Sequence, residues 1–111
     1  MIEGHHIIYK KQATIVDYPL NIIHLGSEEH RGDLGPHKNR ETDLKYKRQL
    51  ESHLRDILGK SHYTIEELIE KLMLNSKQAY KGFKKTPREP EGISREEVIK
   101  RLLGGRYYID C

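Results

Sequence analysis

The chain has 111 residues, of which 33% are charged and 35% hydrophobic, and its formal net charge is +3; this suits one compact domain, or two very small ones, with a thin core. It contains no run of about 18 apolar residues and no secretory-signal pattern, so we expect no transmembrane helix, no membrane partner and a cytoplasmic location. Its single cysteine, Cys111, excludes an internal disulfide framework and a cysteine-based zinc site.

The N-terminal part of the chain predicts two strands and a short helix. Residues 4–10 mix β-branched and aromatic side chains, and residues 20–25, LNIIHL, form a second β-prone run. Ser27 is suited to cap a helix whose first turn holds the acidic residues 28–29. The segment 31–37, RGDLGPH, should end that helix early because it contains two glycines and a proline.

A long helix is predicted over residues 41–58. Apolar side chains recur there every four residues and form one stripe, which is typical of a helix packed against a core. The stripe consists of Tyr46, Leu50, Leu54 and Leu58. Gly59 is a plausible end of the helix.

The pattern of the C-terminal part predicts three short helices. Capping signals precede them: Thr64 with Glu67, Ser76, and Ser94 with Glu97. The first two helices are expected over residues 64–73 and 76–85, and residues 106–109 as a terminal strand or an extended tail. The pattern changes near residue 60, so we expect an α+β chain in two parts, residues 1–60 and 61–111.

Basic residues gather in two stretches. Between residues 71 and 88 there are six basic residues and no acidic one, and residues 31–48 hold a second, more diluted group. Such stretches suit a phosphate backbone, although solvated helix faces are the simpler explanation of charge alone. The helices over 64–73 and 76–85 are compatible with a helix-turn-helix-like DNA reader, or with an ordinary bundle. In the DNA-reading interpretation, the backbone contacts are Lys77, Lys81, Lys84 and Lys85.

Histidines are concentrated near the start of the chain. Five of the seven are His5, His6, His24, His30 and His37. Because neutral imidazole is the commonest transition-metal ligand, this cluster is a candidate metal site. Adjacent strand residues point to opposite faces, so His5 and His6 cannot both bind one ion in a regular strand and make sense only with separate roles. The alternative is a polar pair at a strand end; His24 reads as a structural or surface residue, and His53 and His62 receive no role.

Three segments, GHHII, YPLNIIHL and EEHRGDLGPHKNR, resemble in order the parts of the HNH nuclease motif, with Asn21 fifteen residues after His6 and His30 nine residues further on. The matching region covers residues 4–40. The run HRG…GPHKNR…LKYK is also similar to small HNH proteins of phages and mobile elements. The resemblance implies a ββα-metal core, followed here by a long helix and a helical module, and metal-dependent cleavage of DNA.

The resemblance also implies a role for each matched residue. His5 and His30 take the metal-ligand positions, and His37 is a third ligand or a phosphate contact. His6 takes the general-base position, and Asn21 the middle position that either fixes the loop carrying the base or reaches the metal. Three basic residues beside the ligands could hold phosphate oxygens, or could be ordinary surface charge: Arg31, Lys38 and Arg40. The cofactor implied is one divalent ion, Mg2+, Mn2+, Ni2+ or Zn2+, and the partner is DNA, bound by one chain or by a homodimer.

Two other functions stay open. The chain could be a non-catalytic, metal-binding DNA-binding or regulatory module, although such a module would not need His6. It could also be a structural zinc domain, in which chelation would unfold residues 1–40 and His6 would be dispensable.

Overall fold

The computed structural model describes residues 2–33, 35–36 and 38–109, and for residues 28 and 31 only the backbone. The described chain is a mixed α+β structure with two small antiparallel sheets, which confirms the expected fold class at this level. In chain order, its elements are β1 (Ile2–His6), η1 (Pro19–Asn21), β2 (Ile22–Gly26), α1 (Ser27–Arg31), α2 (Arg40–Ile57), β3 (His62–Tyr63), α3 (Ile65–Leu72), α4 (Ser76–Phe83), β4 (Ile93–Ser94) and α5 (Arg95–Leu102).

The antiparallel pair of β1 and β2 forms the frame for the histidine cluster. A strand was expected over residues 4–10, but β1 ends at His6 because the next backbone groups bond to Asn21 instead of continuing the ladder. The N–H of Ile7 donates to the Asn21 carbonyl at 2.8 Å, and the N–H of Ile8 donates to the Asn21 side chain at 2.8 Å. Both isoleucines are buried, so the alternation of faces that a strand requires is lost there.

The second strand starts later than the expected residue 20. Pro19 opens a short 3-10 helix, η1, because its fixed φ angle suits the first position of a helical turn. The backbone becomes extended at Ile22, where β2 begins. The short helix that follows starts at Ser27 and ends at Arg31, as the glycines after it predicted.

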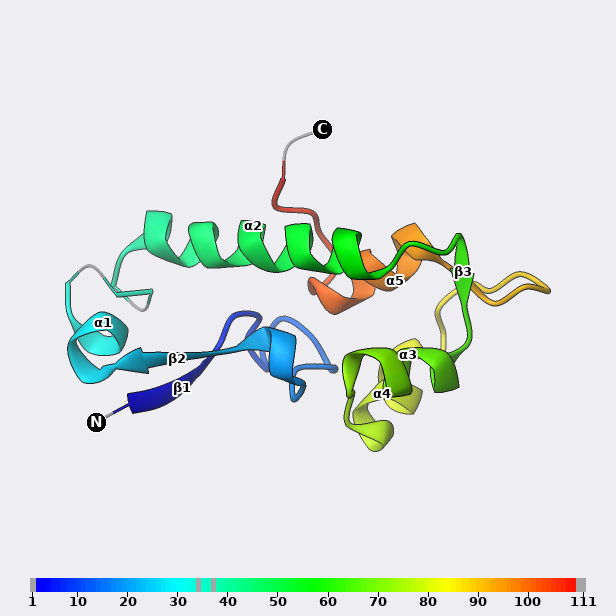
Figure 1. Ribbon diagram of the computed structural model, residues 1–111, viewed down its shortest axis with the longest axis horizontal. Helices are drawn as coiled ribbons and strands as arrows, with labels where there is room; N and C mark the ends of the chain where they lie inside the picture. Colours follow the sequence, from blue (N-terminus) through cyan, green and yellow to red (C-terminus); the bar gives the residue numbers. More distant parts are fainter. Residues whose placement is uncertain (1, 34, 37, 110–111) are drawn as a thin grey trace.

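The longest helix, α2, runs along one side of the molecule (Figure 1). Asn39 caps it through a side-chain hydrogen bond to the first turn. Its buried face includes Leu50 and Leu54, as the four-residue repeat predicted. Two charged residues, Lys47 and Glu51, are also buried on this helix, at 3% and 1% exposure, and the apolar pattern did not predict them.

Side-chain caps open the three C-terminal helices. Thr64 forms the expected capping box at α3, and Ser94 caps α5. At α4 the expected cap was Ser76, but Asn75 has the extended backbone of an N-cap and accepts from the N–H of Gln78 at 3.0 Å. Ser76 is therefore the first helical residue rather than the cap.

One feature of the C-terminal part was not predicted from the sequence. The two-residue strands β3 and β4 pair in antiparallel fashion, and strands this short carry too little alternation to be recognised. Of the two possibilities expected for residues 106–109, a strand or a tail, the structure has the tail. The carboxylate of Glu51 accepts from the N–H of Tyr108 at 2.7 Å and from that of Ile109 at 3.0 Å, which fixes this tail on α2.

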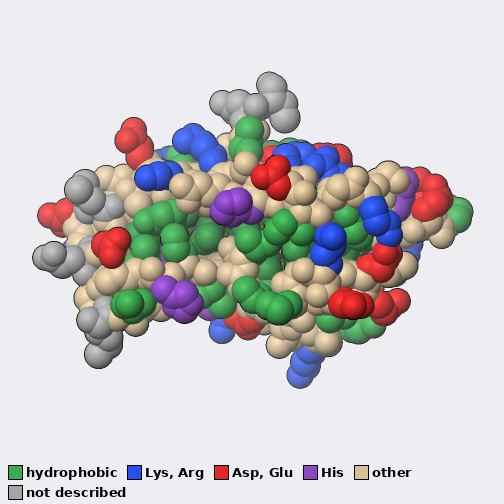
Figure 2. Space-filling model, viewed as in Figure 1, with side chains coloured by type: hydrophobic (Ala, Val, Ile, Leu, Met, Phe, Trp, Pro, Cys, Tyr) green, Lys and Arg blue, Asp and Glu red, His purple; other side chains and the backbone are tan. Residues whose placement is uncertain are grey.

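Among the described residues, one hydrophobic cluster joins the N-terminal and C-terminal elements. It includes Ile8 and Tyr18 before β2, Leu54 of α2, Phe83 of α4 and Ile99 of α5. In Figure 1, α2 lies above the hairpin and α1, and α5 lies next to the C-terminal end of α2, above the α3–α4 pair. Figure 2 shows hydrophobic side chains gathered in the band between these layers. Within the described residues, no helix combines the length and the apolar character needed to cross a bilayer.

The loop between β1 and η1 rests on α4. Gly82 permits this approach, because a Cβ at this position would lie 2.5 Å from Cγ1 of the buried Ile15. One turn earlier, Oε1 of Gln78 accepts from the N–H groups of Val16 and Asp17 at 3.1 and 3.0 Å. The C-terminal helices therefore fix the loop that follows the histidine doublet.

Candidate functional site

The first half of the site is a pair of histidines, one on β1 and one on α1. Nδ1 of His5 lies 3.1 Å from Nε2 of His30, and the ring centroids are 4.9 Å apart. His5 is buried at 3% exposure. Two nitrogens that bind one zinc ion tetrahedrally at about 2.0–2.1 Å are themselves about 3.3 Å apart. The 3.1 Å separation is that of a hydrogen bond between the two rings, and it is also close to the spacing that a shared ion requires.

Glu3 fixes the orientation of His30. Its Oε1 lies 3.0 Å from Nδ1 of His30. Because an ionised carboxylate only accepts hydrogen bonds, Nδ1 carries the proton and Nε2 presents its lone pair toward His5. Carboxylates commonly hold metal-binding histidines in this way. Sequence reasoning assigned Glu3 no role; the available signal was the two-residue alternation that puts Glu3 and His5 on one face of β1.

The second half of the site is His6, which has a different partner. Its Nε2 lies 2.8 Å from Oδ1 of Asp17, and the other oxygen of Asp17 accepts from Nε2 of Gln78 at 2.6 Å. These hydrogen bonds, chiefly the one from His6, hold the pKa of Asp17 below its ordinary value. Because an ionised Asp17 only accepts, Nε2 of neutral His6 carries the proton and Nδ1 keeps the lone pair.

Asn21, the middle residue of the sequence motif, is fully buried. Its Oδ1 accepts from the N–H of Ile8 at 2.8 Å, and its Nδ2 donates to the carbonyls of Ile8 and Val16 at 3.1 and 2.9 Å. These bonds join the residues just after His6 to the residue just before Asp17. Of the two roles expected for Asn21, the contacts correspond to fixing the loop.

The histidines of both halves open on one cavity of about 340 Å³. Its lining consists of Gly4, His5, His6, Tyr9, Lys10 and His30. The ring of Tyr9 meets His5 edge-on at a centroid distance of 5.7 Å. Its hydroxyl donates to Oδ1 of Asp43 at 2.7 Å, so α2 supports this wall of the cavity.

The other residues predicted near the ligands are less informative. His37 lies outside the described residues, as does the side chain of Arg31. Lys38 and Arg40 are exposed beside the start of α2, and Nζ of Lys38 lies 4.0 Å from a carboxylate oxygen of Asp33. Their assignments as a ligand or as phosphate contacts stay predictions.

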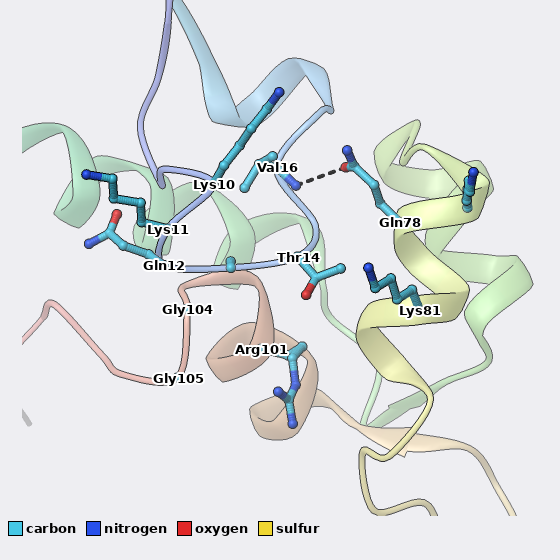
Figure 3. Close-up of a pocket in the computed structure, with 12 residues that line it drawn as sticks. Lys10, Lys11, Gln12, Thr14, Val16, Gln78, Lys81, Arg101, Gly104 and Gly105 are labelled. Carbon is cyan, nitrogen blue, oxygen red and sulfur yellow. Dashed lines mark hydrogen bonds between the residues drawn. The ribbon is translucent and has the colours of Figure 1, made fainter.

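The four predicted lysines of the C-terminal part fall into two pairs. Lys77 and Lys81 line a cleft of about 590 Å³ between the loop 10–14, α4 and the end of α5 (Figure 3). Lys84 and Lys85 are exposed just beyond the end of α4 and do not line this cleft.

A separate group of side chains could also hold a metal ion. Ligand atoms of His62, Glu89 and Glu91 lie within 4.8 Å of one another, and Nε2 of His62 is 3.2 Å from Oε2 of Glu89. Both glutamates are exposed, and exposed acidic groups of this kind are common without an ion. The sequence analysis gave His62 no role because it lies outside the HNH-like motif, and the short β3–β4 pair next to these glutamates was not predicted.

Chemically, the cavity combines two histidines spaced for a cation with a third whose Nδ1 can accept a proton. Comparisons of the chain with protein-family models, curated proteins and solved structures found no match. The geometry of the site, together with the sequence motif, is therefore the basis for a functional conclusion.

Proposed function

We propose that the protein is a metal-dependent endonuclease of the HNH type that hydrolyses phosphodiester bonds in DNA. The observation that carries the proposal is that His5, His6 and His30 line one cavity, while carboxylates set the orientation of His30 and His6 separately. The order β1, β2, α1, with histidines on the first strand and on the helix, is compatible with a ββα-metal core. The resemblance of residues 4–40 to the HNH motif supplies the reaction class.

His5 and His30 would hold one divalent cation. The 3.1 Å spacing of their nitrogens and the hydrogen bond from His30 to Glu3 support this assignment. A cation there would neutralise charge on the scissile phosphate and stabilise the leaving oxygen. Because imidazole is a better ligand for transition metals than for Mg2+, which prefers oxygen, Mn2+, Ni2+ or Zn2+ fits this pair better than Mg2+.

His6 would act as the general base. Its Nδ1 takes a proton from a water molecule, the water oxygen bonds to phosphorus, and the phosphorus–oxygen bond to the leaving group breaks. The resulting imidazolium is stabilised by Asp17, which already accepts from Nε2. Asn21 and Gln78 are positioning residues, since they fix the loop that presents Asp17.

A plasmid-nicking assay with Mg2+, Mn2+, Ni2+ or Zn2+ tests these roles. His6→Ala should lower the cleavage rate by about 10²–10⁴-fold and keep metal binding, measured by calorimetry, whereas His5→Ala and His30→Ala should lose it. His24→Ala is the matched control, because His24 is an exposed histidine of the same hairpin. Cleavage by His6→Ala at the wild-type rate in every metal would show that His6 is not the base.

Two further results separate this proposal from its alternatives. DNA binding without cleavage in any of the four ions would favour a non-catalytic module. His62→Ala should leave cleavage unchanged, because His62 does not line the histidine cavity. If His62→Ala lost cleavage while the variants of the histidine cavity kept it, the catalytic metal would instead be assigned to the group formed by His62, Glu89 and Glu91.

A further inference from the structure

A basic cleft adjoins the histidine cavity. Three segments distant in sequence contribute five cationic side chains to its lining: Lys10, Lys11, Lys77, Lys81 and Arg101. None of the described residues that line it is acidic. Figure 3 shows the loop, α4 and α5 around this cleft, with the side chain of Lys81 extending toward the loop at Thr14.

The cleft cations form few contacts with carboxylates; the charge of Lys10 helps to lower the pKa of Asp17, but Lys10 makes no ion pair in the described part of the chain. None of its five cations forms an ion pair with an acid within the described part of the chain, whereas Lys47, Arg55 and Lys60 each do. Like charges gathered in a concave surface raise the local potential and attract anions. This distinguishes the cleft from a solvated helix face on which charges of both signs alternate.

The cleft is a product of the tertiary structure. Lys77 and Lys81 are four residues apart on α4 and so share one helix face. At the end of α5, Gly104 has a positive φ of 81°, and a Cβ there would lie 2.8 Å from the carbonyl oxygen of Gln12. This close approach brings Arg101 to the same cleft as the lysines of the loop.

The cleft and the histidine cavity share a wall. Lys10 lines both of them. Gln78, which also lines the cleft, donates to Asp17, the hydrogen-bond partner of His6. A chain of phosphates lying in the cleft would therefore continue into the cavity.

We propose that this cleft binds the sugar–phosphate backbone of the DNA strand on one side of the scissile phosphate. The inference rests on the proposed nuclease function and adds the path of the substrate. Lysine and arginine contacts to phosphate position a strand without reading its sequence. None of the described lining residues is aromatic, so the cleft offers no stacking platform for bases. The contacts it makes are independent of DNA sequence.

The test measures binding of a short fluorescent DNA duplex to the full chain by anisotropy, without metal, at about 50 to 200 mM salt. The cleft variant is Lys77→Gln/Lys81→Gln. The matched control is Lys84→Gln/Lys85→Gln, which removes the same charge just beyond the same helix but outside the cleft. All four lysines are exposed, so both variants should fold, which thermal melts will check.

If each cleft lysine neutralises one phosphate, the salt slope of the binding constant should fall by about 1.8 in magnitude. A fourfold rise in salt weakens DNA binding by a certain factor in the wild type. In the cleft variant, this factor should be about twelve times smaller. The control should change the slope by less than about 0.5. Two duplexes of unrelated sequence should give the same changes in salt slope. A change in slope that depended on the DNA sequence would contradict backbone binding.

The outcomes separate this inference from the nuclease proposal. Equal changes in slope for the two lysine pairs, or no change for either, would overturn the cleft as a binding surface even if the wild type cuts DNA. The expected difference between the pairs, together with no cleavage in any metal, would support the cleft and refute the nuclease.

Discussion

Replacing Asn21 with alanine should destabilise the protein strongly although it removes no charge. The N–H and the carbonyl of Ile8 would lose their bonds to this side chain, whereas the carbonyl of Val16 would keep the N–H of Tyr18 at 3.2 Å. A buried polar group left unpaired costs about 1–3 kcal/mol. Two such groups predict a loss of about 3–4 kcal/mol, a large part of the roughly 5–15 kcal/mol that stabilises a domain.

Urea unfolding followed by circular dichroism measures this loss. Asn39→Ala is the control, because the cap of α2 should cost only about 1 kcal/mol. If Asn21→Ala lost no more than that, the reasoning that its amide holds the loop would be wrong. A stable variant with weakened metal binding, measured by calorimetry, would instead assign Asn21 to the metal.

Two other substitutions test the electrostatics of the fold. Asp17→Asn should slow DNA cleavage by about 10²-fold or more with unchanged metal affinity in calorimetry, because an amide N–H facing His6 favours the tautomer that lacks a lone pair on Nδ1. Burial raises the pKa of Glu51, but the N–H donors of the tail and Arg55 lower it by more than burial raises it. The pKa of Glu51 therefore lies below its ordinary value of 4.5. Ionised Glu51 therefore adds stability above pH 4.5, and this stability is lost as the pH falls through the lower pKa of the folded state. When the free energy of unfolding is measured as a function of acid pH, it should fall more steeply in the wild type than in Glu51→Gln.

The helices were largely predictable because their signals are local. The capping box at Thr64 and the repeat that includes Leu50 and Leu54 each lie within a few residues of the helix that they specify. The end of β1 was not predictable in this way. Ile7 and Ile8 have the composition of a strand, but the side chain of Asn21 takes the backbone groups that a strand would need.

The candidate site was likewise predictable only in part. The resemblance of the segments that contain His5, His6 and His30 to the HNH motif implied their roles. Alternation along β1 could place Glu3 on the face of His5, but it could not show which histidine each carboxylate contacts. Glu3 is 27 residues from His30, and Asp17 is 11 residues from His6. Those contacts depend on how α1 folds back on β1 and on how the loop before η1 packs against α4.

The two roles proposed for the adjacent histidines therefore depend on different parts of the chain. His5 meets His30, which Glu3 holds, so the metal pair is built within the hairpin and α1. His6 is oriented by Asp17, which in turn is held by Gln78 of α4. The helical C-terminal part therefore also supports the histidine cavity, because α4, the helix that lines the basic cleft, holds the residue that would orient the proposed base.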